Sequence, residues 1–408
     1  MRLPQPAKLK ERLLPFVRLP RPSMLRERLL RFGRVERSPL RDGNQAALYD
    51  SGGALLEACR ELIRAAQVSI DIEMYIWACD DVGRGFCELV GASLDRGVAV
   101  RILYDALGCW EETSHLTALG QRGATVVAFR PITPWRIREN PNHRNHRKLL
   151  IVDDTVAIVG GANWGSDYDS NLFPEAFLDV GLGVQGPVVA DLARDFRRVW
   201  AMESEEAIPF PRPPRAGLSP PGRSFADVPV QMLSGIARGD RGSIRRMYGL
   251  LIRSATRKLF VANSYFVPGR RLVKDLSRAA WRGLDVTLLL PGHTDMKWVQ
   301  MAGRATYEPL LKAGVKIFER KDRMYHGKAA VVDGEVAVVG TSNLDPRSFR
   351  HNLELNLNAY HPVLAAALLV GLEGELSHSD RVELATFQRR PLLQKIWSRI
   401  AYWFKYWL

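Results

Sequence analysis

Two closely similar segments lie 180 residues apart in this chain of 408 residues. The first is HRKLLIVDDTVAIVGGAN, residues 146–163, and the second is HGKAAVVDGEVAVVGTSN, residues 326–343. Each has a histidine, a lysine two positions later, an aspartate seven positions later, a glycine fourteen positions later and an asparagine seventeen positions later. Because these positions match at one constant offset, the sequence indicates an internally duplicated body.

The similarity between the halves extends upstream of these segments. A helical pattern, ALLEACRELIRAAQ, precedes the apolar run VSIDIEMYIWA in the first half, and SIRRMYGLLIRSATRK precedes LFVANSYFVPG in the second. Helical and β-rich segments then continue to alternate. The alternation predicts an α/β fold of two duplicated lobes, each a mixed β-sheet flanked by helices. We expect the lobes to be related by a pseudo-two-fold axis, with the active site between them.

A proline-rich stretch separates the two halves. Residues 205–229 contain seven prolines, which favour an extended linker over a helix. The predicted organisation has five parts: a basic arm at 1–42, a first lobe at 43–204, the linker at 205–229, a second lobe at 230–388 and a C-terminal arm at 389–408.

The net charge of +14 is concentrated in the two arms. Residues 1–42 carry 12 basic and 4 acidic side chains, and residues 389–408 carry 5 basic and no acidic ones. The remaining 41 basic and 40 acidic residues give the body, 43–388, a net charge of +1. An enzyme of nucleic acids more often carries its excess positive charge around the groove that binds the phosphates. The distribution therefore argues against a nucleic-acid partner.

The C-terminal arm, RRPLLQKIWSRIAYWFKYWL, has the pattern of an amphipathic helix that Pro391 opens. Its apolar residues recur every three or four positions, and its basic residues lie largely off this stripe. Tryptophan and tyrosine beside a basic face are typical of a membrane interface. The alternative is a terminal helix that packs on the protein's own core. The candidate membrane-binding residues are Arg390, Lys395, Trp397, Arg399, Trp403, Phe404, Lys405 and Trp407.

The N-terminal arm nearly repeats itself, with KLKERLLPFVR at 8–18 and MLRERLLRFGR at 24–34. Proline and glycine limit each copy to a short helix. Two interpretations stay open: a solvated basic tail, or a segment that lies on anionic lipid. The chain has no run of about 18 or more apolar residues, so the sequence predicts no transmembrane helix.

The histidine and lysine of each motif suit chemistry at a phosphate. Residues two apart on a strand share a face, so we expect His146 beside Lys148 and His326 beside Lys328. A lysine supplies positive charge to phosphate oxygens, and a histidine can attack phosphorus or transfer a proton. Substitution at a phosphodiester with an alkoxide leaving group needs both a nucleophile and an acid. Two motifs that meet between the lobes supply both.

Other residues admit two interpretations. Asp153 and Asp333 are candidate catalytic residues, but they fall at predicted β-hairpin turns, where aspartate is common for local hydrogen-bonding reasons. His143, His146 and Asp153 could bind zinc, but the second half has no histidine matching His143. Four aromatic residues at the ends of the first strands line either a lipid entrance or the core: Tyr75, Trp77, Tyr265 and Phe266.

The two HxKxxxxD…GxxN segments resemble the phospholipase D superfamily. Within it the chain is similar to bacterial cardiolipin synthases of the B type, a form that has about this length and lacks N-terminal transmembrane helices. The resemblance covers about residues 43–380 and implies two phospholipase D-like lobes. Besides the two motifs, the matching stretches are IDIEMYIWACDDVGRGF, LGVQGPVV and LDPRSFRHNLELN.

The resemblance implies a ping-pong reaction without a metal or other cofactor. One histidine, usually the first, forms a phosphohistidine with a phosphatidyl group, and the other protonates the departing alcohol. A second alcohol then displaces the enzyme. The residues carried over as catalytic are His146, Lys148, Asp153, His326, Lys328 and Asp333. Those carried over as phosphate-binding or supporting are Asn163, Asn343, Asp179 and Glu354, of which the last two are the acids that hold the imidazoles.

The resemblance also implies phospholipid partners at a membrane. Phosphatidylglycerol is the implied substrate, with phosphatidylethanolamine as a further one, and the anionic surface at the cytoplasmic face of a bacterial inner membrane is the implied location. Three alternatives stay open: phospholipase D-type hydrolysis or transfer to another alcohol, a phosphodiesterase or nuclease acting on nucleic acid, and a membrane scaffold with an inactive site.

Overall fold

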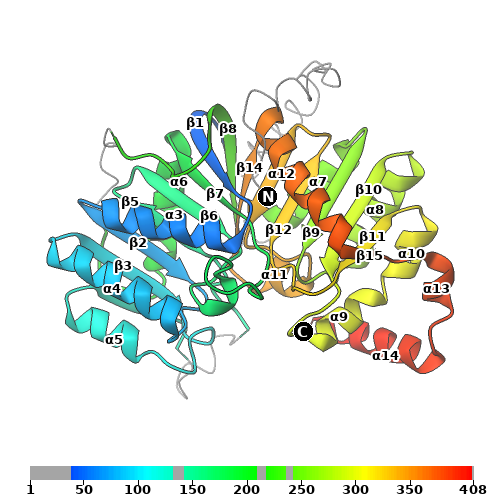
Figure 1. Cartoon of the computed structure of the whole chain (residues 1–408), viewed down its shortest axis with the longest axis horizontal. Helices are drawn as coiled ribbons and strands as arrows, with labels where there is room; N and C mark the ends of the chain where they lie inside the picture. Colours follow the sequence, from blue (N-terminus) through cyan, green and yellow to red (C-terminus); the bar gives the residue numbers. More distant parts are fainter. Residues whose placement is uncertain (1–37, 132–141, 209–216, 236–241, 407–408) are drawn as a thin grey trace. The chain divides into compact units, whose positions relative to one another are not determined.

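The computed structural model describes residues 38–131, 142–208, 217–235 and 242–406 (Figure 1). The repeated segments of the N-terminal arm and the candidate membrane-binding residue Trp407 lie outside the described residues. Within them, no helix combines the length and the apolar character needed to cross a membrane.

The first lobe alternates strands and helices along the chain. Its strands are β1 (Leu40–Tyr49), β2 (Ser69–Met74), β3 (Ala99–Asp105), β4 (Thr125–Phe129), β5 (Leu149–Val152), β6 (Val156–Gly160) and β7 (Gly181–Gln185). Its helices are α3 (Gly52–Ala65), α4 (Asp81–Asp95), α5 (Ser114–Gln121), the 3-10 helix η2 (Ser166–Tyr168) and α6 (Pro187–Trp200). Polar side chains cap the first turns of helices. The Ser51 hydroxyl, for example, caps α3 by accepting from the Ala54 N–H.

The second lobe repeats this order and adds a C-terminal extension. Its strands are β8 (Ser224–Ser234), β9 (Lys258–Asn263), β10 (Asp285–Pro291), β11 (Lys316–Arg320), β12 (Lys328–Val332), β13 (Val336–Gly340), β14 (Leu355–Ala359) and β15 (Ser379–Arg381). Its helices are α7 (Ser243–Ser254), α8 (Arg270–Trp281), α9 (Lys297–Arg304), α10 (Tyr307–Lys312), α11 (Pro346–Arg350), α12 (Pro362–Gly374), η3 (Glu375–His378), α13 (Leu384–Gln388) and α14 (Leu392–Trp403).

The two lobes share one 15-stranded sheet, which runs through both of them in Figure 1. Its strand order is β15-β11-β10-β9-β12-β13-β14-β8-β1-β7-β6-β5-β2-β3-β4. From the central antiparallel pair of β1 and β8, the order β7-β6-β5-β2-β3-β4 on one side repeats as β14-β13-β12-β9-β10-β11 on the other. The predicted α/β fold of two duplicated, helix-flanked mixed sheets is confirmed. The sheets are fused edge to edge by the antiparallel pairing of β1 with β8. β1 starts inside the residues expected to be arm, and β8 starts inside those expected to be linker.

Each motif forms the predicted β-hairpin. Strands β5 and β6 pair antiparallel, as do β12 and β13. The turn after β5 places Asp153 and Asp154 in the left-handed region, with φ of 53° and 50°, and the Val152 carbonyl accepts from the Thr155 N–H at 2.9 Å. Aspartate, asparagine and glycine tolerate that region best, which explains the Asp-Asp and Asp-Gly sequences at the two turns.

Alternate residues of the hairpin strands pack into different cores. Ile151 faces a large core that also contains Phe196 of α6 and Leu368 of α12, so that this core joins the two lobes. Its neighbour Leu150 faces a second core, built with α3, α4 and α5 of the first lobe. Because both faces of these strands are buried, the hairpins and the residues just before them are held firmly by the fold.

Candidate active site

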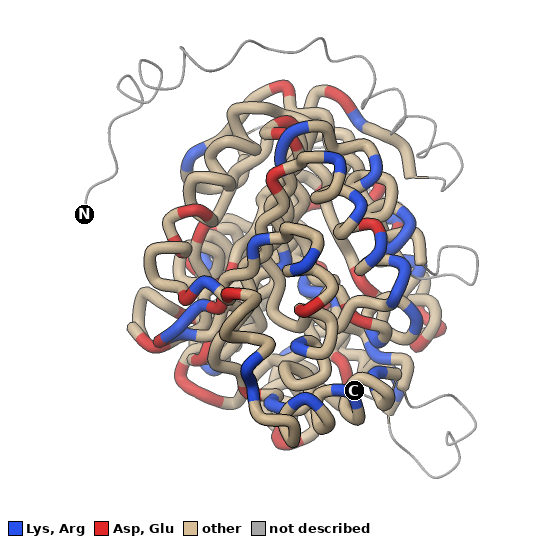
Figure 2. Tube along the Cα trace, turned by 90° about the vertical axis from the view of Figure 1, so that its right-hand side faces the viewer, with Lys and Arg blue, Asp and Glu red and all other residues tan. Residues whose placement is uncertain are grey.

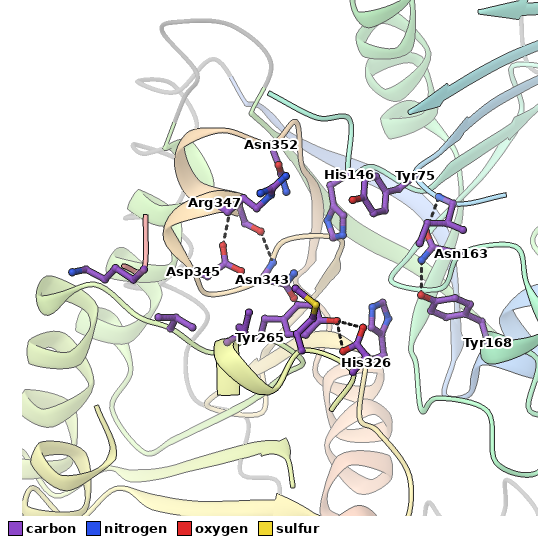
Figure 3. A pocket seen from close by; sticks show the side chains of 17 residues that line it. Tyr75, His146, Asn163, Tyr168, Tyr265, His326, Asn343, Asp345, Arg347 and Asn352 are labelled. Carbon is purple, nitrogen blue, oxygen red and sulfur yellow. Dashed lines mark hydrogen bonds between the residues drawn. The ribbon is translucent and has the colours of Figure 1, made fainter. Parts of the chain in front are cut away.

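The two motif histidines project into one pocket of about 350 Å³ at the junction of the lobes (Figure 3). The backbone holds them there by reciprocal contacts between the halves. The His146 N–H donates to the Leu353 carbonyl at 3.0 Å, and the His326 N–H donates to the Leu178 carbonyl at 2.7 Å. Each histidine therefore precedes a hairpin of its own lobe and is fixed by a loop of the other lobe.

The carboxylates that hold the imidazoles are exchanged between the halves. Nδ1 of His146 lies 3.1 Å from both carboxyl oxygens of Glu354, and Nδ1 of His326 lies 2.7 Å from Oδ2 of Asp179. All four side chains are nearly or fully buried. An ionised carboxylate can only accept, so with either acid in its charged form the hydrogen of its imidazole lies on Nδ1 and the lone pair lies on Nε2.

The electrostatic surroundings keep both imidazoles neutral at neutral pH. Burial, assisted by the charge of Lys328, lowers the pKa of His326 to about 4. Burial and the charges of Lys148 and Lys328 hold the pKa of His146 well below its ordinary value. A neutral imidazole carries the lone pair that a nucleophile or a general base needs.

The two acids differ in charge state. Burial is the largest single influence on Asp179 and raises its pKa, but the hydrogen bond from His326, the charge of Lys328 and the Val180 N–H together outweigh burial and hold that pKa below its ordinary value. For Glu354 burial prevails and raises the pKa to about 7. At neutral pH Asp179 is therefore ionised, whereas Glu354 is partly protonated.

The motif lysines are buried next to the histidines. Nζ of Lys328 lies 3.1 Å from both ring nitrogens of His326 and also donates to the His326 carbonyl. Nζ of Lys148 donates to the His146 carbonyl at 2.8 Å and lies 5.0 Å from the centre of the Tyr75 ring. Burial is the main cause that lowers the pKa of Lys148 to about 7 and that of Lys328 to about 8. A phosphate anion bound there favours the charged form of both amines.

Asn163 and Asn343 line the same pocket. The Asn163 amide donates to the Tyr168 hydroxyl at 2.7 Å, and its oxygen accepts from the Ile76 N–H at 3.2 Å. The oxygen of Asn343 accepts from the Ser264 hydroxyl at 2.7 Å. Both amides are therefore fixed in orientation at the edge of the site.

Asp153 and Asp333 are not brought to the pocket. They lie at the far ends of the hairpins, seven residues after the histidines, or about 20 Å at the rise of a strand. The Asp153 carboxylate accepts from the N–H groups of Val68 at 2.7 Å and Ser69 at 2.9 Å. The Asp333 carboxylate makes the same kind of bonds, with the Lys258 N–H at 2.9 Å among them. The catalytic interpretation of these aspartates is replaced by a structural one, because their oxygens bind the loop before β2 or β9.

The residue after the last strand of each hairpin lies next to the carboxylate of the same half. In the first motif this residue is Gly161, where a Cβ atom would lie 2.4 Å from Oδ1 of Asp179. In the second motif it is Thr341, whose hydroxyl donates to Oε2 of Glu354 at 2.5 Å. GGAN has a glycine at this position because Asp179 lies too close for a side chain, whereas GTSN has a threonine because Glu354 lies far enough away to accept from its hydroxyl.

Several pocket residues went unrecognised as site candidates in the sequence. Of the four aromatic residues expected at either a lipid entrance or the core, Tyr75 and Tyr265 line the pocket, whereas Trp77 and Phe266 are buried in the core. The further lining side chains that no motif marked include Tyr168, Asp295, Asp345, Arg347 and Asn352, and Lys405 also lines the pocket although the sequence predicts it at the membrane. The LDPRSFRHNLELN stretch was a signal for three of them, since Asp345, Arg347 and Asn352 belong to it.

The zinc alternative has no geometric support in the described residues, where no group of three or more potential ligands is placed to hold a metal ion. His143 is engaged elsewhere, with Nδ1 at 2.8 Å from the His351 carbonyl.

The C-terminal helix α14 packs on α9 and leaves its apolar stripe exposed. The most buried residues of its contact face are small, with Ser398 4% and Ala401 3% exposed, and the Tyr402 hydroxyl donates to the Pro268 carbonyl at 2.9 Å. Leu392 and Trp403, by contrast, are 71% and 77% exposed. The other exposed members of the stripe are Leu393, Ile396, Ile400 and Phe404, with Trp397 beside them.

The basic candidates of this arm have varied surroundings. Arg390 stacks on the Phe387 ring, Lys395 donates to the Gln388 carbonyl at 2.6 Å, and Arg399 is exposed. Lys405 differs from them because it lines the pocket. The arm thus forms an exposed surface and also reaches the site.

Comparison with known proteins finds similarity to cardiolipin synthases, both by family model and by individual relatives. The family described as "Cardiolipin synthase, PLD-like domain" matches residues 59–200 and 250–373. The cardiolipin synthase of Geobacillus sp. (strain WCH70) is 32% identical over 368 residues, which cover 90% of this chain and 72% of that protein. The cardiolipin synthase B of Salmonella typhi is 32% identical over 350 residues, which cover 82% of this chain and 81% of that protein.

Solved structures share the fold at low sequence identity. The phosphatidylserine synthase of Haemophilus influenzae Rd KW20 aligns with a TM-score of 0.67 and 16% identity, covering 93% of this chain and 99% of that one. The polyphosphate kinase of Porphyromonas gingivalis aligns with a TM-score of 0.59 and 14% identity, covering 83% of this chain and 49% of that one. At such identities the likeness concerns the fold.

Proposed function

Since this chain belongs to the cardiolipin synthase family, phosphatidyltransferases of the phospholipase D superfamily, we propose that it transfers a phosphatidyl group from one phospholipid to phosphatidylglycerol through a phosphohistidine. The observation that carries the proposal is the pair of histidines in one pocket, each hydrogen-bonded to an acid of the other half. Such a pair supplies a nucleophile and an acid on opposite sides of one phosphorus atom.

In the first step, Nε2 of one histidine attacks phosphorus and the bond from phosphorus to the headgroup oxygen breaks. The other histidine gives its proton to that oxygen, and the headgroup leaves as glycerol or another alcohol. The family order makes His146 the nucleophile and His326 the acid. His326 gains the required proton when the phosphodiester anion binds, because a nearby negative charge favours the imidazolium.

In the second step, His326 removes the proton from a hydroxyl of the acceptor, and the resulting oxygen attacks phosphorus. The bond from phosphorus to His146 breaks and the free imidazole returns. The acids keep the Nδ1 hydrogens oriented and stabilise the imidazolium that forms. Lys148 and Lys328 supply positive charge to the non-bridging oxygens, and Asn163 and Asn343 complete the phosphate site.

We further propose that the enzyme works on the surface of an anionic membrane, at the cytoplasmic face of a bacterial inner membrane. The exposed stripe of α14 supports this, as does its continuation on α9, where Trp298 is exposed and its ring centre lies 6.3 Å from that of Trp397. Met296 and Val299 of the same region line the pocket. An apolar surface at the mouth of the site suits a substrate whose headgroup must leave the bilayer only slightly.

The mixed charge of the body supports a lipid over a nucleic acid. Figure 2 views the side that carries α14, and basic and acidic segments mingle over it. A groove for nucleic acid requires a continuous basic track.

Purified protein supplied with phosphatidylglycerol alone, and then with phosphatidylethanolamine added, tests the proposal. We expect cardiolipin and free glycerol from phosphatidylglycerol alone, and a labelled enzyme when the phosphatidyl group is labelled. Phosphatidic acid as the main product would assign the protein to hydrolysis, and ethanolamine release would identify the second lipid. Failure to release any headgroup from either lipid would contradict phosphatidyl transfer.

A further inference from the structure

Two cations line the pocket without an ion pair to any described residue. Within the described part of the chain, the guanidinium of Arg347 forms no hydrogen bond or ion pair. The amine of Lys405 makes only a long hydrogen bond to the Tyr402 carbonyl, at 3.4 Å, and lies 4.3 and 4.7 Å from the ring centres of Tyr402 and Tyr406. A cation held by aromatic rings rather than a carboxylate keeps its charge available to an anionic ligand.

The acids that line the pocket are already engaged by other groups. Both oxygens of Asp295 accept from the Tyr265 hydroxyl, at 2.7 and 2.8 Å. Asp345 caps the start of α11 by accepting from the Ser348 N–H at 2.7 Å. Neither acid forms an ion pair with Arg347 or Lys405, although burial raises the pKa of Asp345 and the charge of Arg347 lowers it to a smaller extent.

Arg347 and Lys405 line the pocket that holds the histidines, and burial, the motif lysines and the charge of Arg347 together lower the pKa of His146. The reacting phosphate already has Lys148 and Lys328, which contact the histidine backbone directly. Figure 3 shows Arg347 on the side of the pocket formed by the second lobe, between His146 and Asn352. Lys405 enters from the end of the C-terminal arm. Because both side chains line one pocket, a second anionic group that extends from the histidine centre toward this side shares the cavity with both cations.

We propose that Arg347 and Lys405 form a second anion subsite, which binds the phosphodiester of the acceptor lipid while its glycerol hydroxyl faces the histidines. The inference rests on the proposed function, because the acceptor phosphatidylglycerol carries its own phosphate three carbons from the reacting hydroxyl. A guanidinium can bind two phosphate oxygens in a planar fork, and the lysine adds a point charge. The subsite thus favours an anionic lipid over water or an uncharged alcohol as acceptor.

The subsite also makes the C-terminal arm part of the binding pocket. Arg350 of α11 lies 4.6 Å from the centre of the Tyr406 ring, so the segment after α14 is held against the same helix that carries Arg347. Removal of the arm consequently removes one cation of the pocket as well as the exposed stripe.

The test compares two acceptors with the full chain in mixed micelles. Cardiolipin formation uses phosphatidylglycerol as acceptor, and the exchange of labelled glycerol into phosphatidylglycerol uses an uncharged one. We expect Arg347→Gln and Lys405→Gln to lower the ratio of cardiolipin formation to glycerol exchange by at least about tenfold each, the loss expected for one charge-assisted hydrogen bond. Matched controls are Arg381→Gln and Lys312→Gln, whose side chains form exposed ion pairs away from the pocket. Equal losses with both acceptors would place these cations at the reacting phosphate and overturn the proposal.

A binding measurement decides the subsite independently of any turnover. By calorimetry, the unmodified chain is expected to bind glycerol 1,3-bisphosphate at least about tenfold more tightly than glycerol 3-phosphate, and each glutamine variant is expected to lose that preference. Equal affinities in the unmodified chain, or a preference that survives both substitutions, would contradict the subsite. Absence of all transfer together with a clear bisphosphate preference would contradict the proposed function alone.

Discussion

His146 is hydrogen-bonded to Glu354, which lies 208 residues further along the chain and belongs to the other lobe. His326 is bonded in the same way to Asp179, 147 residues earlier. Neither half of the duplication therefore contains a complete histidine–acid pair, although each contains a complete sequence motif. The site exists only where β1 and β8 hold the lobes together.

Replacement of either histidine should abolish transfer. His146→Ala removes one of the two roles and His326→Ala removes the other, so each is expected to lower activity by at least about 10²-fold. The circular dichroism spectrum should stay unchanged. A variant with an intact spectrum that keeps more than about a tenth of the activity would contradict a two-histidine mechanism.

The two kinds of motif-associated aspartate should behave differently. Asp179→Asn leaves His326 with the wrong hydrogen-bond partner and is expected to lower kcat by about 10²–10⁴-fold in a protein of near-normal melting temperature. Asp153→Asn disturbs the bonds to the loop before β2 and is expected to cost about 1–3 kcal/mol of unfolding free energy. The folded fraction of Asp153→Asn should keep its kcat. A large loss of kcat in a fully folded Asp153→Asn sample would restore its catalytic interpretation.

A single methyl group at Gly161 should disturb the site. In Gly161→Ala the new carbon would lie 2.4 Å from Oδ1 of Asp179, so the carboxylate must move away from His326. We expect activity to fall by at least about tenfold, as for a displaced catalytic group. Gly85→Ala is the matched control, because nothing lies within 4 Å of a Cβ atom at that helical position. A Gly161→Ala enzyme as active as this control would show that Asp179 does not need its present position.

Activity should decline on the alkaline side of neutrality. The lysines are charged below their pKa values, about 7 for Lys148 and about 8 for Lys328, so the free enzyme binds a phosphate best below these values and loses that ability as pH rises through them. The profile of kcat/KM reports the free enzyme, whereas the limb of kcat should lie at higher pH because bound substrate stabilises the charged amines. Profiles of a short-chain, detergent-dispersed phosphatidylglycerol at constant ionic strength measure both. A kcat/KM that stays constant well above pH 8 would contradict a charge role for the lysines.

The exposed stripe of α14 should be needed for binding to vesicles. Replacement of Trp397 and Trp403 by serine removes large apolar side chains from the surface and leaves the packed face of Ser398 and Ala401 intact. We expect weaker co-sedimentation with anionic vesicles and an unchanged melting temperature. Deletion of residues 389–408 should weaken binding further and flatten its salt dependence, because it removes five basic residues. Undiminished co-sedimentation of the double variant would reject α14 as an anchor.

The features that the sequence predicts correctly have a local sequence signal. The apolar runs and the Asp-Asp and Asp-Gly turns are short-range signals, and both hairpins formed where they indicated. The exchange of acids between halves has no local signal, because it depends on the pairing of β1 with β8. Asp153 belongs to the same motif as His146 although a strand separates them, and the seven-residue spacing implies this separation only once the segment between them is known to be a strand. Lys405 reaches the pocket only through the packing of α14 on α9, which the amphipathic pattern of α14 does not encode.

The reciprocal pairing also constrains how such a chain can evolve. After the duplication the two halves were free to diverge at most positions, as GGAN and GTSN illustrate. A substitution that alters the reach of an acid, however, can be compensated only in the half that carries its histidine. Covariation between residues around Asp179 and those around His326, and between Glu354 and His146, is therefore expected to be stronger than covariation within either repeat. The two halves form one site together. Neither half can lose its histidine or its acid without inactivating the whole enzyme.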